Sequence, residues 1–211
     1  VKTFINKLNS KKSPGYDGIN ANVLKMLPRK SIVFLTSMFN SVLRLNHFPA
    51  QWKYAKIILI PKPNKCENEV TSYRPISLLV LLAKIFEKIL LKRLFPLIEA
   101  QNIIPDHQFG FRLQHGTPEQ CHRIVDVITD TLERKLYCSA VFLDVQQAFD
   151  RVWHLGLLYK IKKMLPAPFY FILKSYLIDR QFYVNINDEN SNFGIIKSGV
   201  PQGSVLGPVL Y

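Results

Sequence analysis

An acidic residue directly after an apolar run is the first place where this sequence suggests chemistry. Residues 140–154 read AVFLDVQQAFDRVWH, so four apolar residues precede Asp144, and a second acid, Asp150, follows six positions later. Taking a carboxylate toward an apolar interior costs free energy unless a partner compensates for it. Asp144 is therefore either a cap at a strand-to-helix junction or a ligand for a positively charged group. We expect Asp150 to pair with Arg151 or another local cation, and we leave it outside the candidate site.

The charge of the chain is distributed unevenly. The net charge of +13 comes almost entirely from residues 1–100, which carry 17 Lys and Arg against 5 Asp and Glu, a balance of +12. Residues 101–211 carry 11 against 10, a balance of +1. Because neutralising phosphates releases counterions, a phosphate backbone is the partner that such a polycation favours. A membrane surface is the alternative, but we find no basic amphipathic helix with an aromatic face, and no membrane partner is expected.

Length and composition indicate one globular domain, or one domain with two lobes. The 211 residues are 48% hydrophobic and 20% charged, a composition typical of a folded chain. No apolar run approaches the roughly 18 residues that span a bilayer, and the first residues contain no signal-peptide core. Three cysteines with no CxxC spacing favour a reducing compartment, so an intracellular location, nucleus or cytoplasm, is expected.

Apolar periodicity predicts the elements that must position Asp144. Helical spacing predicts helices near 19–27, over 32–45, around 85–89 with Pro96 bending or restarting the helix, over 117–133, and twice within 154–178. Strands are predicted at 56–63, at 137–145, and as a hairpin of 180–186 with 192–199. The strand at 137–145 ends in Asp144 and Val145 and is apolar enough to be buried on both faces. Helices and strands mix without a strict βαβ order, so the predicted fold class is α+β.

Seven short motifs then occur in one order along the chain. They are KSPGYDGI (12–19), IPKP (60–63), YRPISLL (73–79), KIFEKIL (84–90), QFGFR (108–112), FLDVQQAFDRVWH (142–154) and GVPQGSVLGP (199–208). Together they resemble the reverse transcriptases of non-LTR retrotransposons, in particular the jockey-like group of animal mobile elements. The resemblance covers about Lys12 to Tyr211. It implies a right-hand polymerase fold and an enzyme that copies an RNA template from a DNA primer, using deoxynucleoside triphosphates (dNTPs) and two Mg²⁺ ions.

The resemblance implies a metal-ligand role for two residues. The first acid of the FLDV motif binds catalytic magnesium in this family, which assigns the role to Asp144, and the backbone carbonyl of Val145 resembles a second ligand. Mg²⁺ is hard and dehydrates reluctantly, so one or two carboxylates, water and substrate phosphates suffice to hold it. Two such ions can activate an attacking 3′ hydroxyl and stabilise a leaving pyrophosphate.

Five further residues match substrate-binding positions of the family. Lys62 and Arg74 match basic residues that hold the incoming triphosphate, a role that suits the planar fork of arginine. Phe149 matches the large residue beneath the sugar, and Gln202 with Gly203 matches a loop beside the template and the nascent base pair. Either cation could instead lie on the surface without a role, and Phe149 could be a core residue.

An acidic pair offers a competing metal site. Asp188 and Glu189 are the only adjacent acids in the sequence and fall between the two strands of the predicted hairpin. Many polymerases hold metal-binding carboxylates at a hairpin turn. However, NDEN flanked by asparagines is typical of an exposed turn, so we interpret this pair as turn chemistry.

The resemblance also implies domain boundaries and missing parts. Residues from about 19 to 115 correspond to the fingers, and those from about 116 to 211 to the palm with interleaved finger segments. The paired-aspartate hairpin, the rest of the palm and the thumb have no counterpart in the 211 residues, so we expect a fragment that does not polymerise alone. A non-catalytic nucleic-acid-binding remnant and another palm polymerase, such as an RNA-copying RNA polymerase, are the alternatives.

Overall fold

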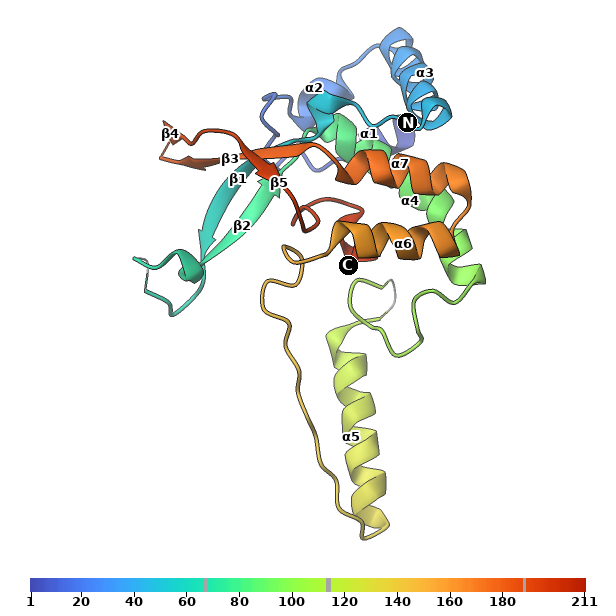
Figure 1. Ribbon diagram of the computed structural model, residues 1–211, viewed down its shortest axis with the longest axis vertical. Helices are drawn as coiled ribbons and strands as arrows, with labels where there is room; N and C mark the ends of the chain where they lie inside the picture. Colours follow the sequence, from blue (N-terminus) through green and yellow to red (C-terminus); the bar gives the residue numbers. More distant parts are fainter. Residues whose placement is uncertain (67, 113–114, 188) are drawn as a thin grey trace.

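The protein combines helices with one five-stranded sheet (Figure 1). A computed structural model describes residues 1–66, 68–112, 115–187 and 189–211. The helices are α1 (Lys2–Asn6), α2 (Ala21–Lys25), α3 (Arg29–Leu45), η1 (Ala50–Trp52), η2 (Val70–Ser72), α4 (Leu81–Ala100), α5 (Thr117–Glu133), α6 (His154–Met164), α7 (Ala167–Leu177) and α8 (Gly207–Leu210). The strands are β1 (Tyr54–Pro61), β2 (Tyr73–Leu78), β3 (Arg180–Ile186), β4 (Glu189–Asn190) and β5 (Gly194–Ile196). The predicted mixture of helices and strands is confirmed.

The sheet is mixed, with the order β2-β1-β3-β4 and with β5 also paired to β3. β1 pairs antiparallel with β2, where Ile60 faces Arg74, and parallel with β3, where Ile57 faces Val184. Parallel neighbours need a long crossover connection, and here the chain between β1 and β3 includes four of the α-helices, α4 to α7. The predicted hairpin is confirmed, because β3 pairs antiparallel with both β4 and β5.

An aromatic cluster joins α3, η1, α4 and α7 in the core. The Phe86 ring lies 5.8 Å from Phe39, 5.7 Å from Trp52 and 5.9 Å from Phe48, measured between ring centroids. Phe48 meets Tyr176 edge to face at 5.1 Å. Such pairs add to the free energy of burial, so this cluster anchors α4 against α7 and the start of the sheet.

Most predicted helices are confirmed. The prediction over 32–45 corresponds to α3, that over 117–133 to α5, and the pair within 154–178 to α6 and α7. Of the two predictions for Pro96, a bend or a restart of the helix, the restart is wrong, because α4 continues through this residue. Pro96 and Lys92, whose carbonyl loses its helical partner there, are both exposed, so water can solvate that carbonyl.

The strand predicted at 56–63 forms, but it is not a buried one. β1 has a single buried residue, Ala55, and its last two residues are exposed. Figure 1 shows the cause, since the β1–β2 arm projects away from the helices. The prediction of a strand is therefore right and that of burial is wrong.

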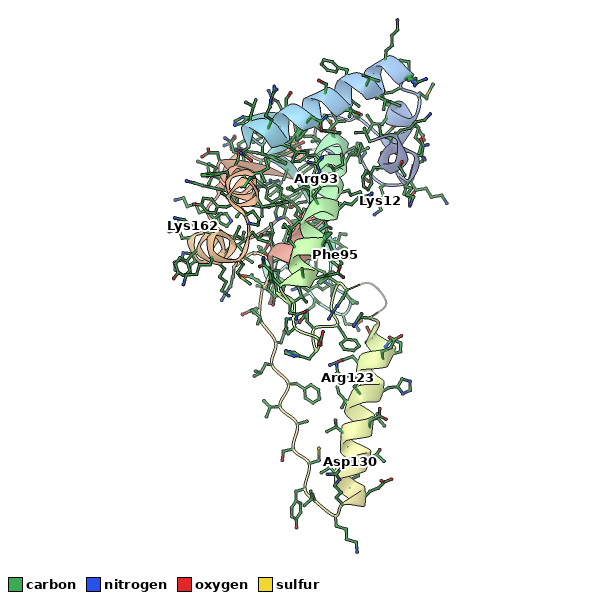
Figure 2. The ribbon with its side chains drawn as sticks, turned by 90° about the vertical axis from the view of Figure 1, so that its right-hand side faces the viewer. Lys12, Arg93, Phe95, Arg123, Asp130 and Lys162 are labelled. Atoms are coloured by element: carbon green, nitrogen blue, oxygen red, sulfur yellow. The ribbon has the colours of Figure 1, made fainter. Side chains whose placement is uncertain are left out.

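The strand predicted at 137–145 does not form. α5 and the segment that follows it extend away from the rest of the molecule, with Arg123 and Asp130 on a helix that has no buried residue (Figures 1 and 2). The returning segment contains no strand, and Phe142 and Leu143 are 85% and 91% exposed. None of the five strands among the described residues pairs with it, so its backbone groups have no sheet ladder there to join.

No helix of the described residues is both long and apolar enough to cross a membrane.

Candidate active site

The loop of residues 199–206 is fixed against β2 by its backbone. The N–H of Ser77 donates a 2.8 Å hydrogen bond to the carbonyl oxygen of Gln202. Gly203 has a φ of +113°, and a Cβ atom there would lie 2.8 Å from the carbonyl oxygen of Ser77. Only glycine combines this backbone conformation with so close an approach, so Gly203 allows the loop to lie directly on the strand. Gln202 is half-buried and Gly203 is exposed.

The same loop is attached to the turn that follows Asp144. The N–H of Val200 donates to the carbonyl oxygen of Phe149 at 2.8 Å, and the N–H of Gly199 donates to that of Val152 at 2.8 Å. Gly199 has a φ of +86°, and a Cβ atom there would lie 2.7 Å from the carbonyl oxygen of Asp150. The structure therefore brings together the loop with Gln202, the strand with Arg74 and the turn with Phe149.

Phe149 is half-buried and packs against other aromatic rings. Its ring stacks on Tyr211 at 5.0 Å and meets Phe111 edge to face at 5.8 Å, both between centroids. A packing role for Phe149 is thus visible in this chain.

The two predicted triphosphate ligands lie close together in the β1–β2 hairpin. Lys62 follows β1, and its backbone N–H donates to the carbonyl oxygen of Ser72 at 2.8 Å. Its ammonium group donates to the carbonyl oxygen of Thr71 at 2.7 Å. Arg74 is exposed on β2. Arg74 is therefore accessible to an anion, whereas Lys62 would have to exchange a backbone partner for one.

Asp144 and Val145 lie in the irregular segment after α5, and both are exposed. Among the described residues there is no group of three or more His, Cys, Asp or Glu side chains that could hold a metal ion. One accessible carboxylate and one carbonyl fit part of the oxygen-ligand set that Mg²⁺ prefers.

The competing acidic pair is described only in part. Glu189 begins β4 and is exposed, opposite Ile186 of β3. Asp188 lies outside the described residues.

The sequence interpretation missed a buried acid, Glu87 of α4. Its side chain is 0% exposed, and its Oε2 accepts hydrogen bonds from the N–H groups of Val205 at 2.6 Å and Leu206 at 3.1 Å. Burial raises the pKa of Glu87, and the nearby cation of Arg180 only partly offsets this effect. A signal was present, because Glu87 lies on the same helical face as Ala83 and Leu90, where an apolar residue is expected.

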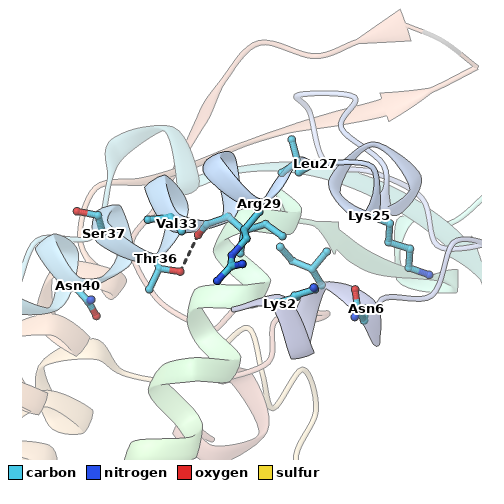
Figure 3. A pocket seen from close by; sticks show the side chains of 11 residues that line it. Lys2, Asn6, Lys25, Leu27, Arg29, Val33, Thr36, Ser37 and Asn40 are labelled. Carbon is cyan, nitrogen blue, oxygen red and sulfur yellow. Dashed lines mark hydrogen bonds between the residues drawn. The ribbon is translucent and has the colours of Figure 1, made fainter.

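A basic pocket lies apart from these residues, among α1, α2 and α3 (Figure 3). Its volume is about 810 Å³. Its lining residues are Lys2, Ile5, Asn6, Lys25, Leu27, Arg29, Ile32, Val33, Thr36, Ser37 and Asn40. They include three cations and no acid, which is the chemistry of a site for phosphate groups.

The fold and these motifs define a class of protein. Residues 60–211 match the family model described as reverse transcriptase (RNA-dependent DNA polymerase), and the chain belongs to this family.

Particular relatives confirm the resemblance to jockey-like elements. The chain is 50% identical over 211 residues to the RNA-directed DNA polymerase from mobile element jockey of Drosophila melanogaster, covering 100% of the chain and 23% of that protein. It is 51% identical over 207 residues to the probable RNA-directed DNA polymerase from transposon BS of the same species, covering 98% of the chain and 23% of that protein. A Pol polyprotein from the R2 element of Popillia japonica is 27% identical over 203 residues, covering 94% of the chain and 27% of that protein. The chain thus spans about a quarter of the length of these relatives.

Proposed function

We propose that this chain is part of an RNA-directed DNA polymerase of a non-LTR mobile element. The longer protein would extend a DNA 3′ end on an RNA template by nucleotidyl transfer from dNTPs. One observation carries the proposal: backbone hydrogen bonds bring the Gln202 loop against both β2, with Arg74, and the turn with Phe149. By resemblance to the family, the Gln202 loop corresponds to the template position, Arg74 to the triphosphate position and Phe149 to the sugar position. We assign residues from about 19 to 115 to the fingers and those from about 116 to 211 to the palm of a right-hand fold.

Asp144 would provide the carboxylate for magnesium. The side chain is exposed, so it can bind a hydrated ion without first losing a protein partner that would have to be replaced. The Val145 carbonyl would add a second oxygen ligand from the same segment. When bound, Mg²⁺ neutralises phosphate charge and lowers the pKa of a ligated hydroxyl.

Arg74 would hold the triphosphate. Guanidinium groups bind phosphate through two parallel hydrogen bonds, and an arginine on a strand is better positioned than one on a loop. Lys62 would add a second cation. Its ammonium group would first exchange the Thr71 carbonyl for a phosphate oxygen, an exchange that favours the charged acceptor.

Gln202 and Gly203 would lie beside the nascent base pair. The side chain of Gln202 can both donate and accept hydrogen bonds, and the absence of a side chain at Gly203 permits close approach of a base or sugar. Phe149, packed behind this loop, would lie beneath the sugar.

The basic half of the chain would bind the template and primer. Phosphate contacts supply most of the affinity of such proteins and are independent of sequence. The basic pocket of α1, α2 and α3 contributes three of these cations.

The proposal is tested by primer extension. A protein of the relatives' length is supplied with an RNA template, a DNA primer, dNTPs and Mg²⁺, and we expect extended DNA product. Replacing the RNA template by DNA, or the dNTPs by ribonucleotides, should reduce the yield. Efficient RNA synthesis would favour another palm polymerase. Tight binding without extension would favour a non-catalytic nucleic-acid-binding protein.

A further inference from the structure

A second anchor, besides the turn with Phe149, holds the Gln202 loop. Glu87 is one of the most deeply buried charged residues of the described chain, and it lies within an apolar stretch of α4, KIFEKIL. Its Oε2 accepts hydrogen bonds from the consecutive N–H groups of Val205 and Leu206, which lie three and four residues after Gln202. Buried N–H groups without a partner are costly, so this one oxygen stabilises the local backbone path.

The site retains an ionisable acid where an apolar side chain would cost less. Lys84, one turn earlier in α4, and Arg180, at the start of β3, both lower the pKa of Glu87, but burial outweighs them and raises it. Arg180 is itself 0% exposed, and its guanidinium group lies 4.7 Å from the centre of the Tyr176 ring. The nearby cations do not fully offset the cost of burying Glu87, so the stability of the fold alone does not account for this acid. Its contacts with the loop instead favour a role in positioning that loop.

The anchor completes a clamp. Ser77 holds the Gln202 carbonyl from β2, and Glu87 lies ten residues further along the chain, in the helix that follows this strand. Gly203 lies between the two anchors with a φ of +113°, which residues with a Cβ atom rarely adopt. The part of the loop from Gln202 to Leu206 is thus held at both ends by one strand–helix unit, the same unit that carries Arg74.

We propose that Glu87 is a positioning residue, which fixes the Gln202–Gly203 loop so that Gln202 is presented to the nascent base pair at a fixed distance from Arg74. The polymerase part of this inference rests on the proposed function. Glu87 itself does not touch substrate. Its effect is on the accuracy of loop placement, and small displacements at a reacting centre have large kinetic effects.

Two substitutions separate positioning from charge balance. Glu87→Gln keeps an oxygen acceptor at the same reach but removes the ionisable group that faces Arg180. Glu87→Asp keeps the ionisable carboxyl group but withdraws it by one methylene from Val205 and Leu206. Positioning predicts that the aspartate variant is impaired and the glutamine variant is not. Charge balance predicts the reverse. Glu99→Asp and Glu99→Gln, at an exposed position of the same helix, are the matched controls.

The first measurement needs no enzymatic activity. In the 211-residue chain, amide hydrogen exchange at Val205 and Leu206 should accelerate by about tenfold or more in Glu87→Asp, and by less than about threefold in Glu87→Gln. Exchange within β1 reports on global stability and should change less. Equal acceleration in both variants, or acceleration in Glu87→Gln alone, overturns the proposal.

The second measurement uses a protein of the relatives' length. The ratio of kcat/KM for matched and mismatched dNTPs is independent of the fraction of folded enzyme, and it should fall by at least about threefold in Glu87→Asp. In a Gln202→Ala background the same substitution should add nothing, because both act through one loop. An unchanged ratio overturns the positioning role. Absence of extension in the wild type would instead refute the proposed function, and the exchange result would still decide the role of Glu87.

Discussion

The carbonyl oxygen of Phe149 accepts a 2.8 Å hydrogen bond from the N–H of Val200, which couples the turn after Asp144 to the loop before Gln202. Two segments about fifty residues apart in sequence are thereby held at a fixed distance, although the segment with Asp144 has no sheet partner among the described strands. A change at Phe149 is expected to act on both.

Phe149→Val is expected to relax the choice of sugar in a protein of the relatives' length. A 2′ hydroxyl would meet the ring and lose solvation against it, which disfavours ribonucleotides by a built-in clash. The ratio of kcat/KM for ribonucleotide over deoxyribonucleotide should rise by at least about tenfold. Phe169→Val, at another half-buried phenylalanine packed against the core, is the control. Loss of activity with an unchanged ratio would leave Phe149 with packing alone, through its contacts with Tyr211 and Phe111.

The pH dependence of stability should reveal the buried Glu87. Because burial raises the pKa of this acid, the folded state retains a proton that the unfolded state has lost. The resulting stabilisation is complete below the unfolded value, near 4.5, and is lost as the pH rises through the folded pKa. Arg180 and Lys84 reduce this shift, and the nearby Tyr176 has a raised pKa of its own.

Chemical denaturation of the wild type and of Glu87→Gln at several pH values measures the effect. The free energy of unfolding of the wild type, minus that of the variant, should decrease from pH 4.5 upward. Glu99→Gln should show no such trend. A difference that stays constant between pH 4.5 and 8 would contradict a raised pKa at Glu87.

Local patterns predicted the helices well and the long-range partners poorly. Apolar spacing located α3 and α5, because helical hydrogen bonds lie within one segment. The segment 137–145 has the composition of a strand, but a strand requires a neighbour, and the described sheet provides none. Glu87 was missed because its partners, the N–H groups of Val205 and Leu206, are more than a hundred residues away. Motif order singled out Gln202 and Phe149 as candidates, yet only the structure shows that the turn with Phe149 is hydrogen-bonded to Val200, two residues before Gln202.

The segment after α5 should exchange its amide hydrogens rapidly in the 211-residue chain. Val141, Phe142 and Leu143 are all more than 80% exposed and belong to no strand. Exchange near the rate of an unstructured peptide is expected there, whereas amides of β1, paired on both sides, should exchange at least about a hundredfold more slowly. If the amides of 137–145 were as protected from exchange as those of β1, the segment would form the buried strand that its composition predicts.

The basic pocket should contribute to nucleic-acid binding by the 211-residue chain. Changing Lys2, Lys25 and Arg29 to glutamine removes its three cations. The logarithm of the affinity for a primer–template duplex should depend less on the logarithm of the salt concentration, by about 0.9 for each phosphate that is no longer neutralised. The control changes Lys160, Lys162 and Lys163 of α6 to glutamine, which removes the same charge elsewhere. An equal effect of both triple changes would indicate a diffuse field without a specific contribution from the pocket.

Asp144 should be essential for extension in a protein of the relatives' length and dispensable for binding. Asp144→Asn preserves the shape of the side chain but removes the negative charge that attracts Mg²⁺. Extension should fall by at least about a hundredfold, because the charge that develops on the transferred phosphate loses its compensation. Primer–template affinity should change by less than about twofold, since basic residues supply the phosphate contacts. The double change Asp188→Asn with Glu189→Gln tests the competing acidic pair, and it should leave extension largely intact because Glu189 lies exposed on a short edge strand. If the double change abolished extension while Asp144→Asn did not, the metal ligands would belong to the hairpin of β3 and β4. Asp144 would then be a cap at a strand-to-helix junction and not a metal ligand.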